Sequence, residues 1–578
     1  MKPRWPRKSD SIAKVSARSV QSAKRLQLFP PRNSRFIQIC PLAMEKYAKL
    51  YAEAVAHMSA RRFAEAAAAC RNILRAAPKN LDAQNLLGLT FLRSGKHLEA
   101  FNSFKAALQI NPKLAILHLN CGLALSQLER TEDAKQSFAR AIACDPRSAE
   151  AHFHMGLLLQ NTYQIEAAVQ SFRSALEINP SHALGHACIG EALLLCGDVK
   201  GAAESLNRAI ALNPAIPGAY DNLGMTALDE GRADIALSWF ERSLKLQPNF
   251  AGSHLNRAVV KLRLGELQDG LEEYEWRWRT PRFGLMGKPR VFPQPRWKGE
   301  PLNGHQILVW GEQGIGDEIR SAAMVADLLE RGENVIVECD VRLTTLFARS
   351  FPKAMIVARS EPPSPLATTQ AIAFQIPSES VLSHTRPNLD HFPKRAQFLI
   401  PDQSLAESLR AKLPKLGKNR PIIGLSWGSY NPQLQRGKST PLADWEPVLS
   451  QTENLFVNLQ YGDTTEERAG VEKKLAVHIT HLPDLDLTQD IDGLAALISA
   501  CDLVITVSNT TAHLAGALGV PTWVALPFGH FQPWYWFTER TDSPWYPSVK
   551  LYRQKAIGDW PNVLKTIAND LKTWHPRS

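Results

Sequence analysis

The sequence predicts an all-α solenoid of helical hairpins, followed by an α/β region with two doubly wound domains. A period of 34 residues runs through the first half of the 578-residue chain and stops at a proline-rich joint, 281–302. Beyond this joint, short apolar runs alternate with amphipathic stretches in a strand-loop-helix-strand order, which is typical of parallel sheets covered by helices. The composition, with 44% hydrophobic and 21% charged residues, is that of a globular protein and excludes a disordered or fibrous chain.

The 34-residue period is defined by three kinds of residue at fixed positions. Prolines recur as Pro78, Pro112, Pro146, Pro180, Pro214 and Pro248. Small residues recur as Gly88, Gly122, Gly156, Gly190 and Gly224, and large apolar ones as Phe104, Phe138, Phe172, Leu206 and Phe240. Because small residues let two antiparallel helices approach closely and proline ends the second helix, each repeat predicts one helical hairpin.

This pattern resembles the tetratricopeptide repeat. The resemblance implies six full repeats and a degenerate seventh over 47–280, stacked into a solenoid whose concave surface holds a protein partner or acceptor. The seventh repeat ends in Glu275-Trp276-Arg277-Trp278-Arg279, and we expect these aromatic residues to seal the solenoid against the next domain. Stacking of nucleic-acid bases on the same side chains is the alternative.

The net charge of +11 comes almost entirely from the N-terminal segment. The chain has 67 Lys and Arg against 56 Asp and Glu, and residues 1–43 account for +9, which leaves +2 for the other 535 residues. The body of the protein therefore gives no reason to expect a nucleic-acid partner. We expect 1–43 to be a disordered basic tail; its composition resembles an organellar transit peptide, and a true translation start at Met44 is the alternative.

The distribution of apolar residues and cysteines bears on location. No run of 18 or more apolar residues occurs, so we expect no membrane span. The eight cysteines show no C-x-x-C spacing and mostly lie in apolar runs, which predicts small buried residues without disulfides or zinc. A cytoplasmic protein in a reducing compartment is the expectation.

The α/β region divides into two series of elements, at 303–400 and 421–575, joined by a linker at 401–420. The first series predicts strands at 305–310 and 334–338 on either side of a glycine-rich turn, 311–318, and a helix, 319–331. The second predicts strands at 422–427, 455–460, 503–507 and 522–526, and helices from 442 and at 465–475, 492–500 and 512–518. Two such halves imply a cleft at the carboxyl ends of the strands, where open α/β sheets bind their ligands.

The glycine-rich turn is the first candidate for chemistry. Gly314 and Gly316 would let the backbone approach a ligand, and Asp317, at the carboxyl end of the first strand, would act as a base. The spacing is not that of a dinucleotide-binding fingerprint, so a purely structural turn is the alternative.

A polar turn, Ser508-Asn509-Thr510-Thr511, is the second candidate. It joins a buried strand to a helix, and free N–H groups at a helix N-terminus suit a diphosphate. His513 lies on the first turn of that helix, where a phosphate donor would be placed; N-capping by Ser, Asn or Thr is the alternative. A third candidate is Lys438, which would neutralise a departing nucleotide unless it is simply solvated.

From about 303 to 575 the chain resembles bacterial family 9 glycosyltransferases, the heptosyltransferase group with the GT-B fold. It is more similar still to proteins that fuse such a domain to tetratricopeptide repeats. The segments that resemble the family are 310–317, Lys438-x-x-Pro441, Leu459-Gln460, 501–519 and 543–560. The resemblance implies two Rossmann-like domains with the acceptor side at 303–400 and the nucleotide-sugar side at 421–575.

The resemblance also implies roles for individual residues. Asp317 matches the base that activates the acceptor hydroxyl, Lys438 the lysine that contacts donor phosphates, and Asp463 is the nearest match to the acid that binds the ribose. Thr510, Thr511, His513 and the backbone of Gly516 would hold the donor diphosphate and sugar. Ser508 stands where the family usually has an Asp that contacts the donor sugar, which implies a different donor or weak or lost activity.

Two functions follow from these observations. The leading one is metal-independent glycosyl transfer from a nucleotide-sugar co-substrate, with no cofactor, to a protein or glycan presented by the repeats. The arrangement is analogous to the eukaryotic O-linked N-acetylglucosamine transferase. The alternative is a non-catalytic tetratricopeptide scaffold for protein-protein interaction, with a degenerate glycosyltransferase domain.

Overall fold

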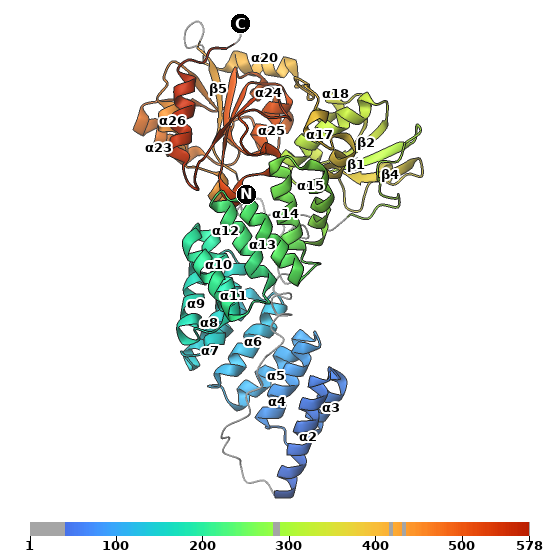
Figure 1. The fold of residues 1–578 in the computed structure, drawn as a ribbon, viewed down its shortest axis with the longest axis vertical. Helices are drawn as coiled ribbons and strands as arrows, with labels where there is room; N and C mark the ends of the chain where they lie inside the picture. The colour runs from blue at the N-terminus through green and yellow to red at the C-terminus, as the bar shows by residue number, and fades with distance from the viewer. Residues whose placement is uncertain (1–40, 281–289, 415–419, 430–434, 577–578) are drawn as a thin grey trace. The chain divides into compact units, whose positions relative to one another are not determined.

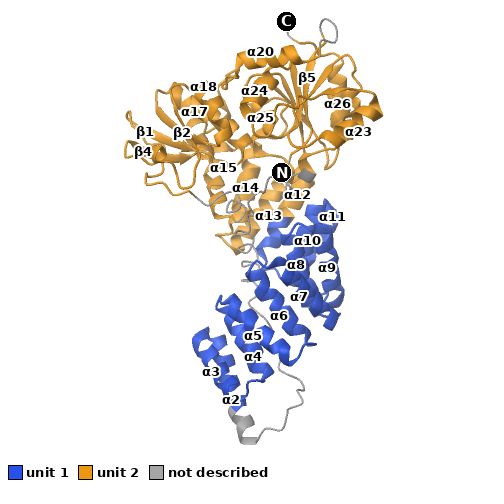
Figure 2. Ribbon diagram, turned by 180° about the vertical axis from the view of Figure 1, so that it is seen from behind, with its two compact units in different colours: residues 1–222 blue, residues 223–578 orange. Residues whose placement is uncertain are grey.

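The computed structural model describes residues 41–280, 290–414, 420–429 and 435–576. Two compact units are present, residues 1–222 and 223–578, and their boundary falls inside helix α12 (Pro217–Asp229) (Figure 2). The expected disordered tail lies outside the described residues up to position 40, and helix α2 (Pro41–Ser59) already includes Met44.

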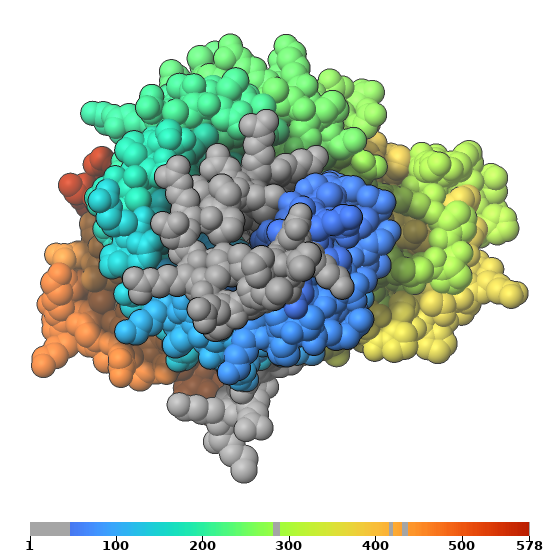
Figure 3. All heavy atoms as spheres, turned by 90° about the horizontal axis from the view of Figure 1, so that it is seen from below, coloured from blue at the N-terminus to red at the C-terminus, as the bar shows by residue number. Residues whose placement is uncertain are grey.

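The first unit is all-helical, and its helices form antiparallel pairs. They are α2, α3 (Phe63–Ala76), α4 (Leu81–Arg93), α5 (His97–Ile110), α6 (Ala115–Gln127), α7 (Thr131–Cys144), α8 (Ala149–Asn161), α9 (Ile165–Ile178), α10 (Ala183–Cys196) and α11 (Val199–Leu212). Pro78 follows α3 by two residues, and Pro112 follows α5 in the same way, so the repeated prolines mark the ends of the second helices. Buried residues of α2 to α6 form one hydrophobic core, and the first repeats are the blue atoms of Figure 3.

Repeated glycines set the packing inside each hairpin. A Cβ atom on Gly88 would lie 2.5 Å from the ring of Phe104, which is fully buried. Gly190 and Leu206 repeat this contact, with 2.6 Å between the added Cβ and the leucine Cγ. The helical hairpin predicted for each repeat is therefore confirmed, together with the reason for its small residues.

The second unit continues with helices of the same kind. They are the end of α12, α13 (Ala233–Leu246), α14 (Ala251–Leu264), the short α15 (Leu267–Tyr274) and a 3-10 turn, η1 (Glu275–Arg279). Buried residues of α14 and α15 belong to the same hydrophobic core as strand β1 (Gln306–Trp310). Trp278 packs on Trp310 of that strand, with 5.6 Å between ring centroids, as expected for aromatic residues that seal the end of the repeats.

The chain after residue 303 forms two parallel sheets with helices on their faces (Figure 1). The first sheet has the order β3-β2-β1-β4, with β2 (Asn334–Cys339), β3 (Met355–Ala358) and β4 (Ile372–Pro377). The second has the order β10-β9-β8-β5-β6-β7, with β5 (Ile422–Ser426), β6 (Leu455–Asn458), β7 (Ile479–Thr480), β8 (Leu503–Val507), β9 (Thr522–Leu526) and β10 (Val549–Arg553). Every residue of β5, β8 and β9 is buried, which explains their continuous apolar sequences.

Helices follow the strands in the order that parallel sheets require. They are α17 (Ile315–Glu330), α18 (Thr344–Ser350), α20 (Gln403–Lys412), α21 (Gln435–Lys438), α22 (Glu446–Leu449), α23 (Thr465–Leu475), α24 (Ile491–Ser499), α25 (Thr510–Ala517) and α26 (Trp560–Leu571), with short turns η4 (Ser378–Val381), η6 (Leu442–Trp445), η7 (Gly529–Phe531) and η8 (Trp534–Trp536). Helix α17 follows β1 and helix α25 follows β8, and these two helices contact each other. Among the described residues, no helix has both the length and the apolar sequence needed to cross a membrane.

The burial of the cysteines is more varied than their sequence context predicts. Cys70, Cys121, Cys339 and Cys501 are buried, as expected for small apolar residues. Cys144, at the end of α7, is exposed, so the prediction is wrong there, because the last turn of that helix faces solvent.

Candidate functional site

The starts of helices α17 and α25 meet at the carboxyl ends of the two sheets. A Cβ atom on Gly316 would lie 3.4 Å from the Cα of Thr510 and 3.3 Å from the ring of His513. A glycine at this position therefore permits the close approach of the two helices. We call the group formed by Asp317, Lys438, Thr510 and His513 the helix-start site.

Asp317 lies on the first turn of α17. Its Oδ2 accepts a hydrogen bond of 3.4 Å from the backbone N–H of Gly314, and its Oδ1 lies 3.6 Å from Nη2 of Arg320. Burial raises the pKa of Asp317, and the nearby Glu379 adds to that rise, whereas the positive charges of Arg320 and Lys438 lower it. The net direction is upward, which makes this carboxylate a stronger base than an exposed Asp.

Arg320 is the buried cation behind Asp317. Its guanidinium forms an ion pair with Glu379, whose carboxylate also accepts a hydrogen bond of 2.9 Å from Ser321. The rings of Trp534 and Tyr535 lie 5.1 and 4.5 Å from the guanidinium carbon. This enclosure holds Arg320 in one position beside Asp317.

His513 is buried and uncharged at neutral pH. Its pKa is lowered well below the usual value by burial, by Arg320 and by Lys438. Its Nδ1 lies 3.0 Å from the hydroxyl of Tyr546, and its ring stacks on Trp536 at 5.3 Å with an interplanar angle of 7°. The imidazole is therefore fixed in orientation.

Gly516 serves packing in this arrangement. A Cβ atom there would lie 2.5 Å from the ring of Tyr546, so only glycine lets that tyrosine reach His513. Gly516 lies in the second turn of α25, beyond the free N–H groups, and the role of its backbone in donor binding stays a prediction.

Asn509 and Thr511 use their side chains inside the protein. Asn509 caps α25 by accepting from the N–H of Ala512 at 3.2 Å, and its amide donates to Ser426 at 2.8 Å. The hydroxyl of Thr511 lies 3.4 Å from that of Ser426 and is fully buried. N-capping, the structural alternative for this turn, therefore describes Asn509, and Thr510 is the residue of the turn that faces Gly316.

Ser508 is buried beneath the same aromatic residues. Its hydroxyl accepts a hydrogen bond of 2.8 Å from Nε1 of Trp536, and it also hydrogen-bonds with Tyr535. The residue that departs from the family pattern thus lies beside the ring that stacks on His513, and both of these hydrogen-bond partners are neutral.

Lys438 ends the short helix α21. Its charge lowers the pKa of both Asp317 and His513, so it contributes to the electrostatics of the helix-start site. The preceding Gly437 lies against the ring of Phe531, where a Cβ atom would overlap the ring. This contact fixes the backbone from which Lys438 projects.

Gln460 and Glu467 border the candidate site; Gln460 belongs to a segment that resembles the family, but no role was predicted for it, and Glu467 was not singled out. The Oε1 of Gln460 accepts from the hydroxyl of Ser426 and from the N–H groups of Trp427 and Gly428, at 2.8–3.0 Å. Glu467 accepts from Nε1 of Trp427 at 2.9 Å and from the N–H of Leu442 at 2.8 Å. Together they shape the loop after β5; the Leu459-Gln460 pair in the sequence was the available signal.

Asp463 lies on an exposed turn at the start of α23. Its carboxylate accepts from the N–H of Thr465 at 3.0 Å, and this backbone hydrogen bond lowers its pKa. Because β6 borders β5, the turn that carries Asp463 lies at the same edge of the sheet as the start of α25.

A buried ion pair connects the last repeat to the glycine-rich turn. Arg277, which is completely buried, donates from Nε and Nη2 to the two carboxylate oxygens of Glu312 at 2.8 and 3.0 Å. Glu312 also accepts from the N–H of Glu379 at 3.0 Å, and burial raises its pKa to about 7. Arg277, the central residue of the cluster 275–279, therefore makes its contacts inside the protein.

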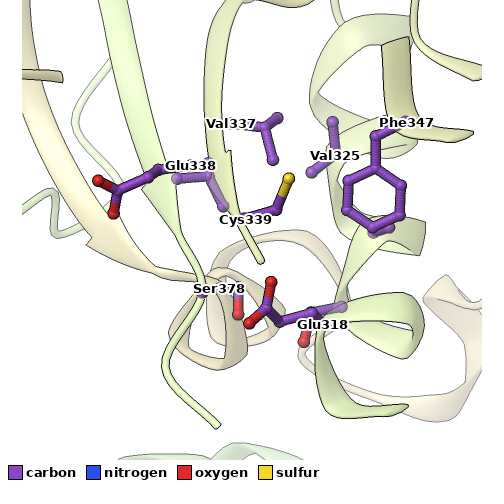
Figure 4. A pocket seen from close by; sticks show the side chains of 11 residues that line it. Glu318, Val325, Val337, Glu338, Cys339, Phe347 and Ser378 are labelled. Carbon is purple, nitrogen blue, oxygen red and sulfur yellow. The ribbon is translucent and has the colours of Figure 1, made fainter. Parts of the chain in front are cut away.

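A small cavity lies under the glycine-rich turn, between β1, β2 and α17. Its volume is about 10 Å³, which holds one water molecule at most. In Figure 4 the carboxylate of Glu318 points toward Ser378, whereas Glu338 points away to the other side of its strand. This cavity is too small for a substrate.

Comparison with known proteins identifies the helical part. Tetratricopeptide repeat families match residues 51–115, 91–154, 149–182 and 217–250. Protein FlbA of Caulobacter vibrioides is 35% identical over 332 residues, which are 54% of this chain and 54% of FlbA, so the chain spans about half the length of that curated relative.

Two solved structures illustrate the similarity of the helical part to known proteins. PilF of Pseudomonas aeruginosa is 17% identical, with 37% of this chain and 98% of that chain covered and a TM-score of 0.35. A thermophilic tetratricopeptide repeat protein of Thermus thermophilus is 22% identical, with 32% and 99% covered and a TM-score of 0.28. The N-terminal region of this chain consists of tetratricopeptide repeats, and a region of parallel sheets and helices follows them.

Proposed function

We propose that the α/β region is a GT-B glycosyltransferase that transfers a sugar from a nucleotide-sugar to a protein or glycan acceptor bound by the repeats. The observation that supports this most is the meeting of two helix starts around Asp317, Lys438 and His513. Helix N-termini and a lysine attract a diphosphate, and a carboxylate with a raised pKa lies beside them. No metal is needed in this arrangement, because Lys438 and the α25 N–H groups supply the positive potential.

The proposed reaction is a single displacement at the anomeric carbon. Asp317 takes the proton of the acceptor hydroxyl, and the acceptor oxygen forms a bond to the anomeric carbon. The bond from that carbon to the diphosphate breaks, and its electron pair leaves with the diphosphate. Lys438 and the start of α25 stabilise the charge that develops on the leaving group, and the neutral ring of His513 donates an N–H to a phosphate oxygen.

Ser508 bears on the choice of donor. A hydroxyl held by Trp536 and Tyr535 presents a neutral surface where the heptosyltransferase family has a carboxylate. We propose that the donor sugar differs from that of the family. We also place the reaction in the cytoplasm, since all the cysteines in the described ranges are free thiols.

The test of this function is turnover of nucleotide-sugars by the full-length protein and by Asp317→Asn. We expect release of nucleoside diphosphate from an ADP- or UDP-sugar, and the variant should be about 10²- to 10⁴-fold slower in kcat because it has no base. Donor affinity should change little, since Asp317 faces the acceptor. Equal turnover by the variant would contradict the role of Asp317, and no nucleotide release or binding at all would contradict the enzyme.

A non-catalytic scaffold is the second candidate, and Ser508 is the observation that favours it. In that case the repeats bind a protein partner and the α/β region binds a nucleotide without turnover. Donor binding by the wild-type protein, measured alongside a complete absence of transfer, would favour the scaffold.

A further inference from the structure

The segment 528–537, which we call the aromatic loop, contacts His513 of the helix-start site and three residues that border the site. Phe531 lies against Gly437, next to Lys438, and Tyr535 covers the guanidinium of Arg320 at 4.5 Å. Trp536 stacks on His513 and donates its indole N–H to Ser508. The position of this one loop therefore determines the surroundings of the base, the lysine and the histidine together.

Arg263 of helix α14 holds the backbone of the aromatic loop. Its guanidinium donates to the carbonyl of Gly529 at 3.0 Å, to that of His530 at 2.9 Å, and to that of Gln532. Its own carbonyl accepts from the N–H of Thr538 at 2.9 Å. Burial lowers the pKa of Arg263 only to about 10, so the side chain stays charged at neutral pH and these bonds are charge-assisted.

Asp229, at the end of helix α12, holds the same loop from a second side. Its Oδ1 accepts from the backbone N–H of His530 at 2.8 Å and lies 2.7 Å from Nδ1 of that histidine. Gly529 has a φ of +70°, and a Cβ atom there would overlap the carboxylate of Asp229. The loop is therefore built to receive this carboxylate.

Both holding residues belong to tetratricopeptide repeats. Asp229 lies in the repeat 217–250, which matches a tetratricopeptide family, and Arg263 lies in the degenerate repeat that follows it. Each is buried, with 8% and 6% of its surface exposed, and neither belongs to the helix-start site itself. Their effect on the site passes through the aromatic loop.

We propose that Asp229 and Arg263 are positioning residues, through which the last two repeats hold the donor-binding side of the site in its working shape. The repeats then have two roles. They bind a partner or acceptor, and the last two of them hold the aromatic loop in position. This inference rests on the proposed function for its effect on donor binding, but its structural claim concerns the loop alone.

The experiment compares full-length Asp229→Ala and Arg263→Ala with the control Arg232→Ala. Arg232 is a matched control because it lies in the repeat 217–250, as Asp229 does, but its side chain is 55% exposed and pairs with Glu230. Hydrogen exchange is measured for the amides of 528–538, and KM and kcat are measured for the nucleotide-sugar. We expect about tenfold faster exchange in 528–538 and about tenfold higher donor KM in both alanine variants, with kcat within about twofold of wild type.

The pattern of exchange separates positioning from general destabilisation. Amides of α26 should exchange as in the wild-type protein, and Asp229→Asn, which keeps one oxygen for the His530 N–H, should recover most of the protection. Unchanged exchange in 528–538, or an equal increase throughout unit 2, would overturn the proposal. If the wild-type protein binds no nucleotide-sugar, the proposed function fails, and the exchange of 528–538 still decides whether the repeats hold the loop.

Discussion

His513 has a neutral imidazole because burial and the positive charges of Arg320 and Lys438 all oppose its protonation. The neutral imidazole is held by the hydroxyl of Tyr546 and by the ring of Trp536, neither of which is charged. In the proposed reaction, this neutral ring would donate to a phosphate without adding a charge to the empty site, and Lys438 would supply the positive charge beside the phosphate.

The lowered pKa of His513 makes folding sensitive to acid. In the unfolded chain this histidine binds a proton as the pH falls below about 6.5, whereas the folded protein resists protonation. Stability is therefore complete above that pH and decreases below it. Replacing His513 by Gln should reduce the loss of unfolding free energy between pH 7.5 and 5.5 by about 1.4 kcal/mol, measured by denaturant titration.

A histidine on the surface provides the control for that measurement. His478, with 71% of its side chain exposed, should leave the pH dependence as in the wild-type protein when it is replaced by Gln. If both variants respond to pH as the wild type does, the buried neutral imidazole at 513 would be disproved.

At the scale of elements, the site depends on glycines that let helices and aromatic rings approach. Gly316 brings α17 to α25, Gly516 brings Tyr546 to His513, and Gly437 brings Phe531 to the segment with Lys438. These three glycines lie in helices, where the residue type is otherwise unfavourable. Each glycine lowers the stability of its helix, but it allows contacts that no larger residue permits.

Gly516→Ala tests this relation. The added methyl group would meet the ring of Tyr546 at 2.5 Å, so we expect a loss of about 1–3 kcal/mol in unfolding free energy. Gly470→Ala is the control, because Gly470 lies in α23 with no atom near its added Cβ. That variant should gain about 0.5–1 kcal/mol from helix propensity. Both are measured by denaturant unfolding, and a stabilised Gly516→Ala protein would contradict the packing role.

Much of the fold was predictable at this scale. The strands 503–507 and 522–526 and the helix 465–475 occur at the predicted bounds, because long apolar runs or a strongly polar helix define them. Strands β3, β4 and β10 were missed: β3 has only four residues with one fully buried, and β10 lies at the edge of its sheet. Helix α17 begins four residues earlier than predicted, since its first turn contains Gly316.

The site was predictable in part, for a related reason. Asp317 and the 508–513 turn follow the rule that parallel sheets bind ligands at the carboxyl ends of their strands. Arg320, Glu379 and the aromatic loop come from other parts of the chain, and only tertiary packing brings them to Asp317 and His513. No spacing in the sequence relates them to one another.

At the scale of the whole molecule, the division into compact units does not follow the division into repeats and sheets. The boundary lies inside α12, so the last repeats share a unit with both sheets. The buried Arg277–Glu312 pair and the Arg263 contacts to 529–532 account for this. The last repeats are thus recognised as repeats in the sequence, but they pack with the α/β region.

The central claim is that a nucleoside diphosphate binds at the helix-start site, and calorimetric titration of the full-length protein with ADP and UDP tests it. One of them should bind to the wild-type protein, and Lys438→Gln should weaken that binding about 10- to 100-fold, because it removes a charge-assisted contact to phosphate. Lys474→Gln, at an exposed lysine of α23 that pairs with Glu446, should bind as the wild type does. Equal affinity of the wild-type and Lys438→Gln proteins, or no binding by the wild type, would contradict the account.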